Sequence, residues 1–144
     1  MEMKVIVFQL NDEEYCIPVN DVRSIEKLQH ITRVPRTAPY VKGVINLRGV
    51  VTPIIDLRTR FHLGSISYNE NTRIIIVALQ DMEVGLVVDA ANDVIDIDSA
   101  MIEPPPEVVG GIEADYLKGV IKIDRRLLIL LNLSQVLEIA EIKE

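Results

Sequence analysis

The side chains that could carry out acid–base or nucleophilic chemistry are few and scattered in this sequence. The two histidines, His30 and His62, stand in different segments, and neither lies beside a kinase or hydrolase motif. Cys16 is the single cysteine and lies between Tyr15 and Ile17, which indicates a small buried side chain rather than a nucleophile. We therefore interpret both histidines as surface residues and expect no catalytic residue in the chain.

The acidic stretch from residue 89 to residue 98 has the composition of a cation site. A Ca²⁺ loop needs oxygen ligands at alternate positions, a glycine at the turn and a bidentate glutamate. Ala90, Ala91, Val94 and Ile95 interrupt that order, and the stretch contains no glycine. We interpret it as a solvated loop with a capping aspartate. Since no Gly-rich phosphate-binding loop occurs either, we expect no metal site and no cofactor.

Arg48 is the charged residue whose position best suits recognition of another protein. It heads the turn of a predicted hairpin, where a guanidinium is either simply solvated or makes a two-pronged contact with a partner's carboxylate or carbonyls. Val19, Val22 and Ile25 are spaced by three residues, which predicts one face of a helical turn beginning at Asn20. That face either packs in the core or lines the rim of a groove.

The composition narrows the class of protein that must position these side chains. The chain has 144 residues, of which 49% are hydrophobic and 26% charged, so it is not a disordered tail. A net charge of −7, with 4% aromatic residues and no tryptophan, argues against nucleic acid and anionic membranes as partners. The first residues lack the long apolar run of a signal peptide or membrane span, and one cysteine fits a reducing compartment. We expect a soluble cytoplasmic protein.

Short runs rich in valine and isoleucine, separated by polar turns, predict β-strands through most of the chain. Residues 5–19 and residues 73–88 each contain two such runs around an acidic turn, which is typical of a β-hairpin. Alternation within the runs is imperfect, which indicates small closed barrels or strands covered on both faces. The charged tips, at residues 12–14 and 81–83, would discourage edge-to-edge pairing between molecules.

The sequence also contains an ungapped internal repeat. Residues 43–57 align with residues 119–133, and both segments begin Gly-Val-Ile and end in leucine. Each reads as a strand, a two-residue turn and a second strand. Asp56 in the first copy and Asn132 in the second are then placed to cap a short helix.

A second match, between residues 10–19 and residues 79–88, precedes the first in the same order. Chance likeness between hairpins is the alternative, but two matches in one order favour two similar β-units packed side by side. A unit of roughly 65–70 residues has little core of its own. The approximate halves 1–68 and 69–144 should therefore share one interface and unfold together, an arrangement that also allows strands to be exchanged between the units.

Three segments resemble the signature of the CheW family of bacterial chemotaxis coupling proteins: residues 33–35 (Arg-Val-Pro), 43–58 (Gly-Val-Ile-Asn-Leu-Arg-Gly, then Val-Val-Thr-Pro-Ile-Ile-Asp-Leu-Arg) and 84–94. The resemblance covers about residues 4–137, nearly the whole chain. It implies a mainly β fold of two SH3-like five-stranded β-barrels packed side by side, with a few short helices and a shared apolar seam. Residues 1–144 would then form a single CheW-like domain.

The resemblance also implies a function without enzymatic activity. Such proteins are adaptors that couple the cytoplasmic tips of methyl-accepting chemotaxis receptors to the regulatory domain of the histidine kinase CheA, which has the same double-barrel fold. The chain would have no nucleic-acid partner and no direct membrane insertion. It would be a monomer in isolation and a cytoplasmic protein that is recruited to receptor arrays at the membrane.

Residue by residue, the resemblance implies two binding surfaces. The receptor-binding groove would use small and aliphatic residues from both halves of the chain: Val22, Ile25, Val19, Ile6, Gly85 and Val94. Kinase contact would use Lys42, Gly43 and Ser24. Arg48 matches an arginine important for coupling, which favours the functional interpretation of this side chain. Ala91, beside the groove, is small where some relatives place a larger aliphatic residue.

Three other interpretations remain open at the level of sequence. The same kind of adaptor could serve another receptor–kinase pathway, such as surface motility. An enzyme or a small-molecule-binding double barrel would need a concave cluster of histidine and acidic residues, and the sequence shows none. A fragment of the kinase itself is a third alternative, against which stand the initial Met1 and the lack of an adjoining ATP-binding segment.

Overall fold

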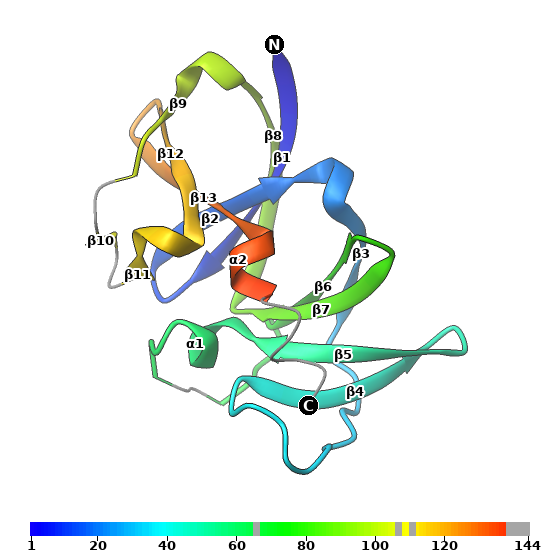
Figure 1. The fold of residues 1–144 in the computed structure, drawn as a ribbon. Helices are drawn as coiled ribbons and strands as arrows, with labels where there is room; N and C mark the ends of the chain where they lie inside the picture. Colours follow the sequence, from blue (N-terminus) through cyan, green and yellow to red (C-terminus); the bar gives the residue numbers. More distant parts are fainter. Residues whose placement is uncertain (65–66, 106–107, 110–111, 138–144) are drawn as a thin grey trace.

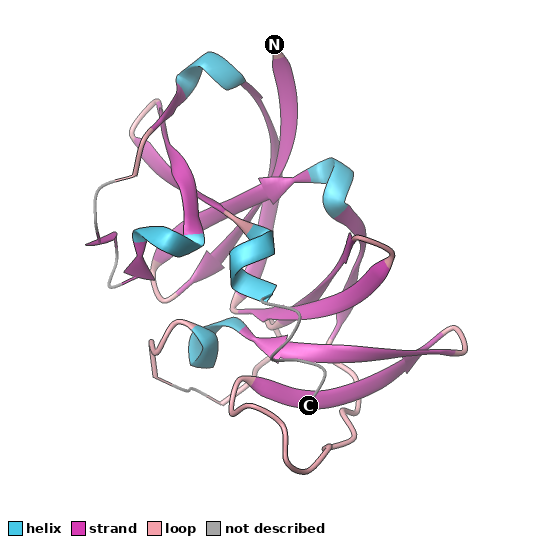
Figure 2. Ribbon diagram, viewed as in Figure 1, coloured by secondary structure: helices cyan, strands magenta, loops and turns pink. Residues whose placement is uncertain are grey.

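Two curved β-sheets make up most of the molecule (Figure 1), and short helices connect and flank them (Figure 2). The structure, a computed structural model, describes residues 1–64, 67–105, 108–109 and 112–137. Sheet I has the strand order β8 (Ala90–Asp98), β1 (Glu2–Leu10), β2 (Glu13–Pro18), β13 (Arg126–Leu131), β12 (Leu117–Ile123) and β9 (Ile102–Glu103). Sheet II has the order β3 (Val22–Lys27), β6 (Arg73–Leu79), β7 (Met82–Val88), β5 (Val50–Asp56) and β4 (Val41–Leu47).

The expected class of fold, mainly β with two small barrels and short helices, is confirmed. Sheet II has the five strands expected, and sheet I has the two-residue strand β9 in addition. The remaining elements are the strand pair β10 (Val108–Val109) and β11 (Ile112–Glu113), the helices α1 (Leu57–Arg60) and α2 (Leu133–Leu137), and the 3-10 turns η1 (Val19–Asp21), η2 (Ser99–Met101) and η3 (Ala114–Tyr116). No helix in the described ranges is both long and apolar enough to pass through a membrane.

Both predicted hairpins with acidic tips are present, and both turn in the same way. β1 and β2 are joined by Asn11 and Asp12, whose φ angles are 54° and 70°. β6 and β7 are joined by Gln80 and Asp81, with φ angles of 51° and 68°. Two successive residues of positive φ match the right-handed twist of the flanking strands, so these turns fix the register of each hairpin.

The order of strands in the two sheets follows one plan. β2 pairs in parallel with β13, so that Tyr15 lies opposite Ile129. In the same way β7 pairs in parallel with β5, and Leu86 lies opposite Ile55. After each hairpin the chain crosses to the other sheet, since β2 leads to β3 in sheet II and β7 leads to β8 in sheet I. Each sheet is therefore built from strands that are not continuous in sequence.

The ungapped repeat corresponds to the hairpins β4–β5 and β12–β13 and to the helices that follow them. The Asp56 side chain accepts hydrogen bonds from the backbone N–H groups of Arg58 at 2.9 Å and Thr59 at 3.4 Å, and so caps α1. The Asn132 side chain accepts from the N–H of Gln135 at 3.4 Å, beside α2. The predicted helix-capping role of these two residues is confirmed.

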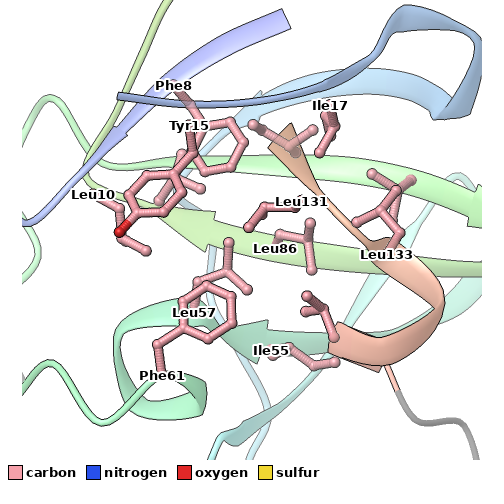
Figure 3. Packing of buried hydrophobic residues seen from close by; sticks show 14 of the residues in the cluster. Phe8, Leu10, Tyr15, Ile17, Ile55, Leu57, Phe61, Leu86, Leu131 and Leu133 are labelled. Atoms are coloured by element: carbon pink, nitrogen blue, oxygen red, sulfur yellow. The ribbon is translucent and has the colours of Figure 1, made fainter. Parts of the chain in front are cut away.

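The largest apolar cluster lies between the two sheets and receives side chains from both (Figure 3). Phe8, Tyr15 and Leu131 enter it from sheet I, while Ile55 and Leu86 enter from sheet II. Smaller clusters fill the inside of each curved sheet: Val5, Val7, Cys16 and Leu128 in sheet I, and Ile45, Ile54, Ile74 and Ile76 in sheet II. The shared seam is thus the main core of the molecule.

The acidic stretch that we interpreted as a solvated loop is instead strand β8, which pairs with β1 along its length. That prediction was wrong because the stretch alternates: Ile95 and Ile97 turn to the cluster inside sheet I, while Asp96 and Asp98 are exposed. The capping aspartate is present, since Asp98 accepts a hydrogen bond from the N–H of Ala100 at 2.9 Å.

The helical turn predicted from the spacing of Val19, Val22 and Ile25 is also wrong beyond its first residues. Only Val19–Asp21 is helical, and Val22–Lys27 is strand β3. β3 pairs with β6, so that Val22 lies opposite Val77 and Ile25 lies opposite Ile75. Pairing with the buried strand β6 provides hydrogen-bond partners for the backbone of this segment. These hydrogen bonds outweigh the weak helical preference that a spacing of three residues indicates.

Candidate functional site

An apolar groove lies where the edges of the two sheets meet. β8 is the outermost strand of sheet I and β3 is the outermost strand of sheet II. The pocket between them and β1 has a volume of about 210 Å³ and is lined by Ile6, Val7, Ile25, Ala91, Asp93 and Val94. Ile25 is 42% exposed and Val94 is 54% exposed, so the groove offers accessible aliphatic side chains.

Three of the six residues expected in the receptor groove come together in this pocket. Ile6 and Val94 lie opposite each other on β1 and β8, and Ile25 faces them from β3 of the other sheet. Val5 and Val7, the neighbours of Ile6, belong to the cluster inside sheet I, so alternation along β1 turns Ile6 to the groove.

The other three expected groove residues lie outside the pocket lining. Val22 is half-buried and packs against the seam cluster, and Val19 is half-buried in η1. Gly85 is buried in β7, where an added Cβ would lie 2.5 Å from Cδ1 of Ile54 and 2.8 Å from Cγ2 of Ile74. The close approach of these side chains gives Gly85 a packing role inside sheet II.

A network of ion pairs compensates the negative charge of Asp93 at the rim of the groove. The Arg126 guanidinium donates two hydrogen bonds to the Glu14 carboxylate, at 2.9 Å and 2.8 Å, and lies 3.5 Å from Asp93. The hydrogen bonds to Glu14 are the main cause of the raised pKa of Arg126. Because Arg126 compensates the charge of Asp93, the groove presents its aliphatic side chains without an isolated charge beside them.

Sheet II carries Lys42, Gly43 and Ser24, which were expected to contact the kinase, and its β4–β5 turn carries Arg48, which was expected to act in coupling. Lys42 is exposed on β4, with its ammonium 5.6 Å from the centre of the Tyr68 ring. Arg48 lies in the β4–β5 turn with φ of 52°, and its side chain is 73% exposed. Its Nη2 lies 3.6 Å from a carboxylate oxygen of Glu26 on β3. This contact joins the two outer strands of sheet II, β3 and β4, and so shows how the sheet curls into a barrel.

Gly43 and Ser24 differ from Lys42 and Arg48 in that both are largely enclosed. Gly43 has a φ of 145°, and a Cβ added there would lie 2.1 Å from the carbonyl oxygen of Thr32. The buried Oγ of Ser24 makes no hydrogen bond with any described part of the chain. These two residues support the shape of the face rather than presenting side chains on it.

Two exposed valines beside Arg48 were not singled out by sequence reasoning. Val50 is 52% exposed and Val51 is 65% exposed at the start of β5. The available signal was the loss of alternation in Arg-Gly-Val-Val, since two consecutive apolar residues at a hairpin tip cannot both face a core. The tip of the β4–β5 hairpin therefore combines a cation with an apolar patch.

The residues considered for chemistry lie apart from one another. His30 and His62 are exposed, as expected. Cys16 is buried in β2, and burial raises the pKa of its thiol to about 12, so the expected structural role of this residue is confirmed. Within the ranges that the structure describes, no three or more histidine, cysteine or acidic side chains are grouped so that they could hold a metal ion.

Two small barrels with a common seam, an apolar groove at the rim and a separate cationic hairpin define a protein-interaction module. A family model described as "CheW-like domain" matches residues 4–141. The chain is 49% identical to the chemotaxis protein CheW of Bacillus subtilis over 138 residues, which cover 94% of this chain and 86% of that protein. It is 38% identical to CheW of Klebsiella aerogenes, covering 94% of this chain and 82% of the relative.

A solved structure agrees with these likenesses. The crystal structure of the scaffolding protein TtCheW from Thermoanaerobacter tengcongensis superposes with a TM-score of 0.88 at 39% sequence identity, covering 96% of this chain and 90% of that one. The chain therefore belongs to the CheW family, and its function is that of a coupling adaptor in chemotaxis.

Proposed function

We propose that the chain links the cytoplasmic tips of methyl-accepting chemotaxis receptors to the regulatory domain of the histidine kinase CheA, without catalysing a reaction. The groove between β3, β1 and β8 carries this proposal. A receptor tip is a helical hairpin, and an aliphatic ridge on a helix can pack into a groove of this kind. Ile25 and Val94 supply exposed aliphatic contacts on the two sides of the groove.

The kinase would bind a different face of the same molecule. Lys42 projects from the start of β4 and Arg48 from the β4–β5 turn, and the exposed Val51 lies near Arg48 at that turn. On β3 the side chains alternate, so Ser24 and Ile25 lie on opposite faces of one strand. Ile25 therefore faces the groove, whereas the buried Ser24 Oγ only supports the barrel behind the proposed kinase face, so the two partners would bind different surfaces.

Separate surfaces for two partners allow extended assemblies to form. Heterologous contacts of this kind can close into rings. Individual contacts of micromolar affinity, about −8 kcal/mol, are sufficient when many of them act together in an array. We further propose that the chain is a monomer in isolation and works in the cytoplasm at receptor arrays, with no nucleic-acid partner and no inserted segment. The net charge of −7 supports the absence of a nucleic-acid partner.

The receptor-binding part of the proposal is tested with Ile25→Asp. A carboxylate in the groove would weaken binding of a receptor cytoplasmic fragment at least about tenfold, because the charge loses water without gaining a partner. Ile25 is 42% exposed on an outer strand, so the fold should survive, whereas Val22 packs against the seam and would test fold and site together. Binding is measured by titration calorimetry, alongside the melting temperature.

Leu127→Asp is the matched control, since Leu127 is 39% exposed on β13 and does not line the groove. It should bind the receptor fragment as the unaltered protein does. Equal binding by the Ile25→Asp and Leu127→Asp proteins, both folded, would remove the groove from the receptor site.

The kinase side is tested with Arg48→Ala. The Arg48–Glu26 pair is exposed on the arginine side, so its loss should cost no more than about 1 kcal/mol of stability. We expect lower kinase activity in a reconstituted mixture of receptor, kinase and adaptor, while the receptor fragment still binds. Full kinase activation by the folded Arg48→Ala protein would show that this guanidinium has no role in coupling.

A further inference from the structure

Charged residues are strongly segregated along this chain. Residues 27–55 contain five lysine and arginine residues and no acidic residue. Residues 74–117 contain ten acidic residues and no lysine or arginine, and the whole chain has a net charge of −7. The cationic part comprises the end of β3, the long loop that precedes β4, and the β4–β5 hairpin, at one end of the molecule (Figure 1). A local positive field therefore exists on an acidic protein.

The loop before β4 forms a pocket of about 300 Å³. Arg33, Arg36 and Lys42 contribute three cations to its lining, and all three residues are exposed. Val34 and Pro39 are among the apolar residues of the same wall. The combination of several cations with small apolar surfaces suits a ligand that carries both carboxylates and aliphatic side chains.

The structure holds this loop in a defined conformation and leaves its arginines available. The Thr37 hydroxyl donates a hydrogen bond to the carbonyl of Val34 at 3.1 Å, and the N–H of Val41 donates to the carbonyl of Ala38 at 2.9 Å. Neither of the two loop arginines makes an ion pair with a described residue.

The backbone at Arg36 adds a second observation. Its φ is 63°, in the left-handed region that glycine and asparagine adopt more readily than arginine. The local backbone conformation therefore does not favour arginine at this position. This indicates that the Arg36 side chain has a functional role.

We propose that the loop formed by residues 33–42 binds an acidic polypeptide segment of a partner protein. Guanidinium groups at Arg33 and Arg36 pair with carboxylates of the segment, and the apolar wall contacts its aliphatic side chains. Nucleic acid fits less well, because the one aromatic side chain of the loop, Tyr40, is only 8% exposed and the net charge repels a long polyanion. The site is separate from the receptor groove, adjoins the proposed kinase face at Lys42, and adds a charge-dependent binding site to the function proposed above.

The test uses the full-length protein and a labelled ten-residue peptide of alternating glutamate and leucine, followed by fluorescence anisotropy. We expect saturable binding that weakens at least tenfold when the NaCl concentration rises from 50 mM to 500 mM, since exposed charge pairs are screened by salt. The same peptide with glutamine in place of glutamate should bind at least tenfold more weakly. Lys42 is left unchanged in every variant, because it also belongs to the proposed kinase face.

Two variants of equal net charge locate the site. Arg33→Glu/Arg36→Glu should reduce affinity for the glutamate peptide at least tenfold. Lys118→Glu/Arg125→Glu alters two exposed cations of the β12–β13 hairpin and should leave the affinity within a factor of two. Melting temperatures of both proteins establish that each is folded.

Arg36→Asn separates the role of the side chain from that of the backbone. Asparagine accepts positive φ, so this variant should melt no lower than the unaltered protein while binding the peptide several-fold more weakly.

Equal loss of binding in the two double variants, or tighter binding of a ten-nucleotide RNA than of the peptide, would overturn the proposal. So would sedimentation of the protein alone as a salt-sensitive oligomer that the Arg33→Glu/Arg36→Glu change dissociates, since the loop would then bind a second copy. None of these outcomes depends on receptor binding by the groove.

Discussion

The side chain of Cys16 packs inside sheet I in a cluster with Val7 and Leu130. It is 0% exposed, and burial raises the pKa of its thiol from 9.0 to about 12. The unfolded thiol therefore loses its proton from about pH 9, whereas the folded thiol keeps it to about pH 12. A group that binds its proton more tightly in the folded state lowers the free energy of unfolding as pH rises through this window. Its contribution is fully present below pH 9 and is lost between the two pKa values.

This shift predicts a pH-dependent difference between the protein and its Cys16→Ala variant. Near pH 8 the variant should be less stable by about 1–2 kcal/mol, because the sulfur fills space in the core. Near pH 10.5 that difference should shrink by about 1–2 kcal/mol, because only the cysteine protein gains stability in its unfolded state. Urea unfolding at the two pH values measures it. A difference that stays constant would mean that the buried thiol ionises as easily as a free one.

At the scale of elements, the repeat places two glycines in the same structural role. Gly43 in β4 and Gly119 in β12 both lie at register irregularities of their hairpins. A Cβ at Gly43 would lie 2.1 Å from the carbonyl oxygen of Thr32, and one at Gly119 would lie 2.5 Å from the carbonyl oxygen of Glu103. Each glycine therefore lets another backbone segment pair with its strand.

Gly43→Ala and Gly119→Ala should each destabilise the fold by at least about 2 kcal/mol, because backbone atoms must move to admit the methyl group. Gly49→Ala is the control: its φ is 85° but nothing lies within 4 Å of an added Cβ. It should cost only about 1–2 kcal/mol from backbone strain. Urea midpoints give the comparison, and the predicted order fails if the Gly43 and Gly49 variants lose the same stability. If the Gly43 variant is destabilised as expected, weaker kinase binding by that variant can result from the loss of stability, so both quantities must be measured.

The sequence predicted the elements that depend on local chemistry. The hairpins, the Asx caps at Asp56 and Asn132 and the repeat follow from turn residues, capping residues and spacing, all of which act over a few positions. Strand β3 was predicted as a helical turn because the spacing of three between Val22 and Ile25 gives no information on the partner strand β6. Strand β8 was predicted as a solvated loop because that interpretation rested on the acidic composition of the segment. The alternation of apolar and acidic residues along it indicates a strand.

The candidate site was less predictable, since it depends on contacts between distant parts of the chain. Ile6 and Val94 are neighbours only because β1 and β8 pair across more than eighty residues, and Ile25 reaches them from the other sheet. The residues of the groove were named through a family resemblance. Periodicity alone left Val22 and Ile25 equivalent, whereas strand alternation places one in the seam and the other on the surface.

At the scale of the whole molecule, one arginine joins the two copies of the repeat. Arg60 of α1 is 8% exposed, and its Nε donates a hydrogen bond to the carbonyl of Val136 in α2 at 2.8 Å. Its Nη2 donates to the carbonyl of Gln135 at 3.4 Å. The guanidinium carbon lies 4.5 Å from the centre of the Tyr40 ring and 5.0 Å from that of Tyr116. The cation thus lies against aromatic rings from both copies.

The two tyrosines occupy equivalent positions, each three residues before one copy of the repeat. The carbonyl of Tyr40 accepts a hydrogen bond from the N–H of Asp56, and the carbonyl of Tyr116 accepts one from the N–H of Asn132, each at 2.8 Å. The arginine has no such counterpart, since the position that aligns with it in the second copy is Val136. A single arginine, from one side of the pseudo-symmetric seam, can reach across it. Two equivalent arginines at this place would repel each other.

Because the largest apolar cluster and Arg60 both lie on the seam, each barrel would keep only its smaller cluster if the other unfolded. Unfolding in urea should therefore be a single transition, coincident by far-UV circular dichroism and tyrosine fluorescence.

Arg60→Met keeps the length of the side chain but loses the hydrogen bonds and the contacts with both rings. It should therefore lower the free energy of unfolding by about 2–3 kcal/mol while the transition stays single. Arg125→Met, at an exposed turn residue, should change stability by less than about 0.5 kcal/mol. Two separate transitions in the unaltered protein would show that each barrel is stable alone, and equal stability of the Arg60→Met and Arg125→Met proteins would show that the seam is held by apolar packing without the arginine.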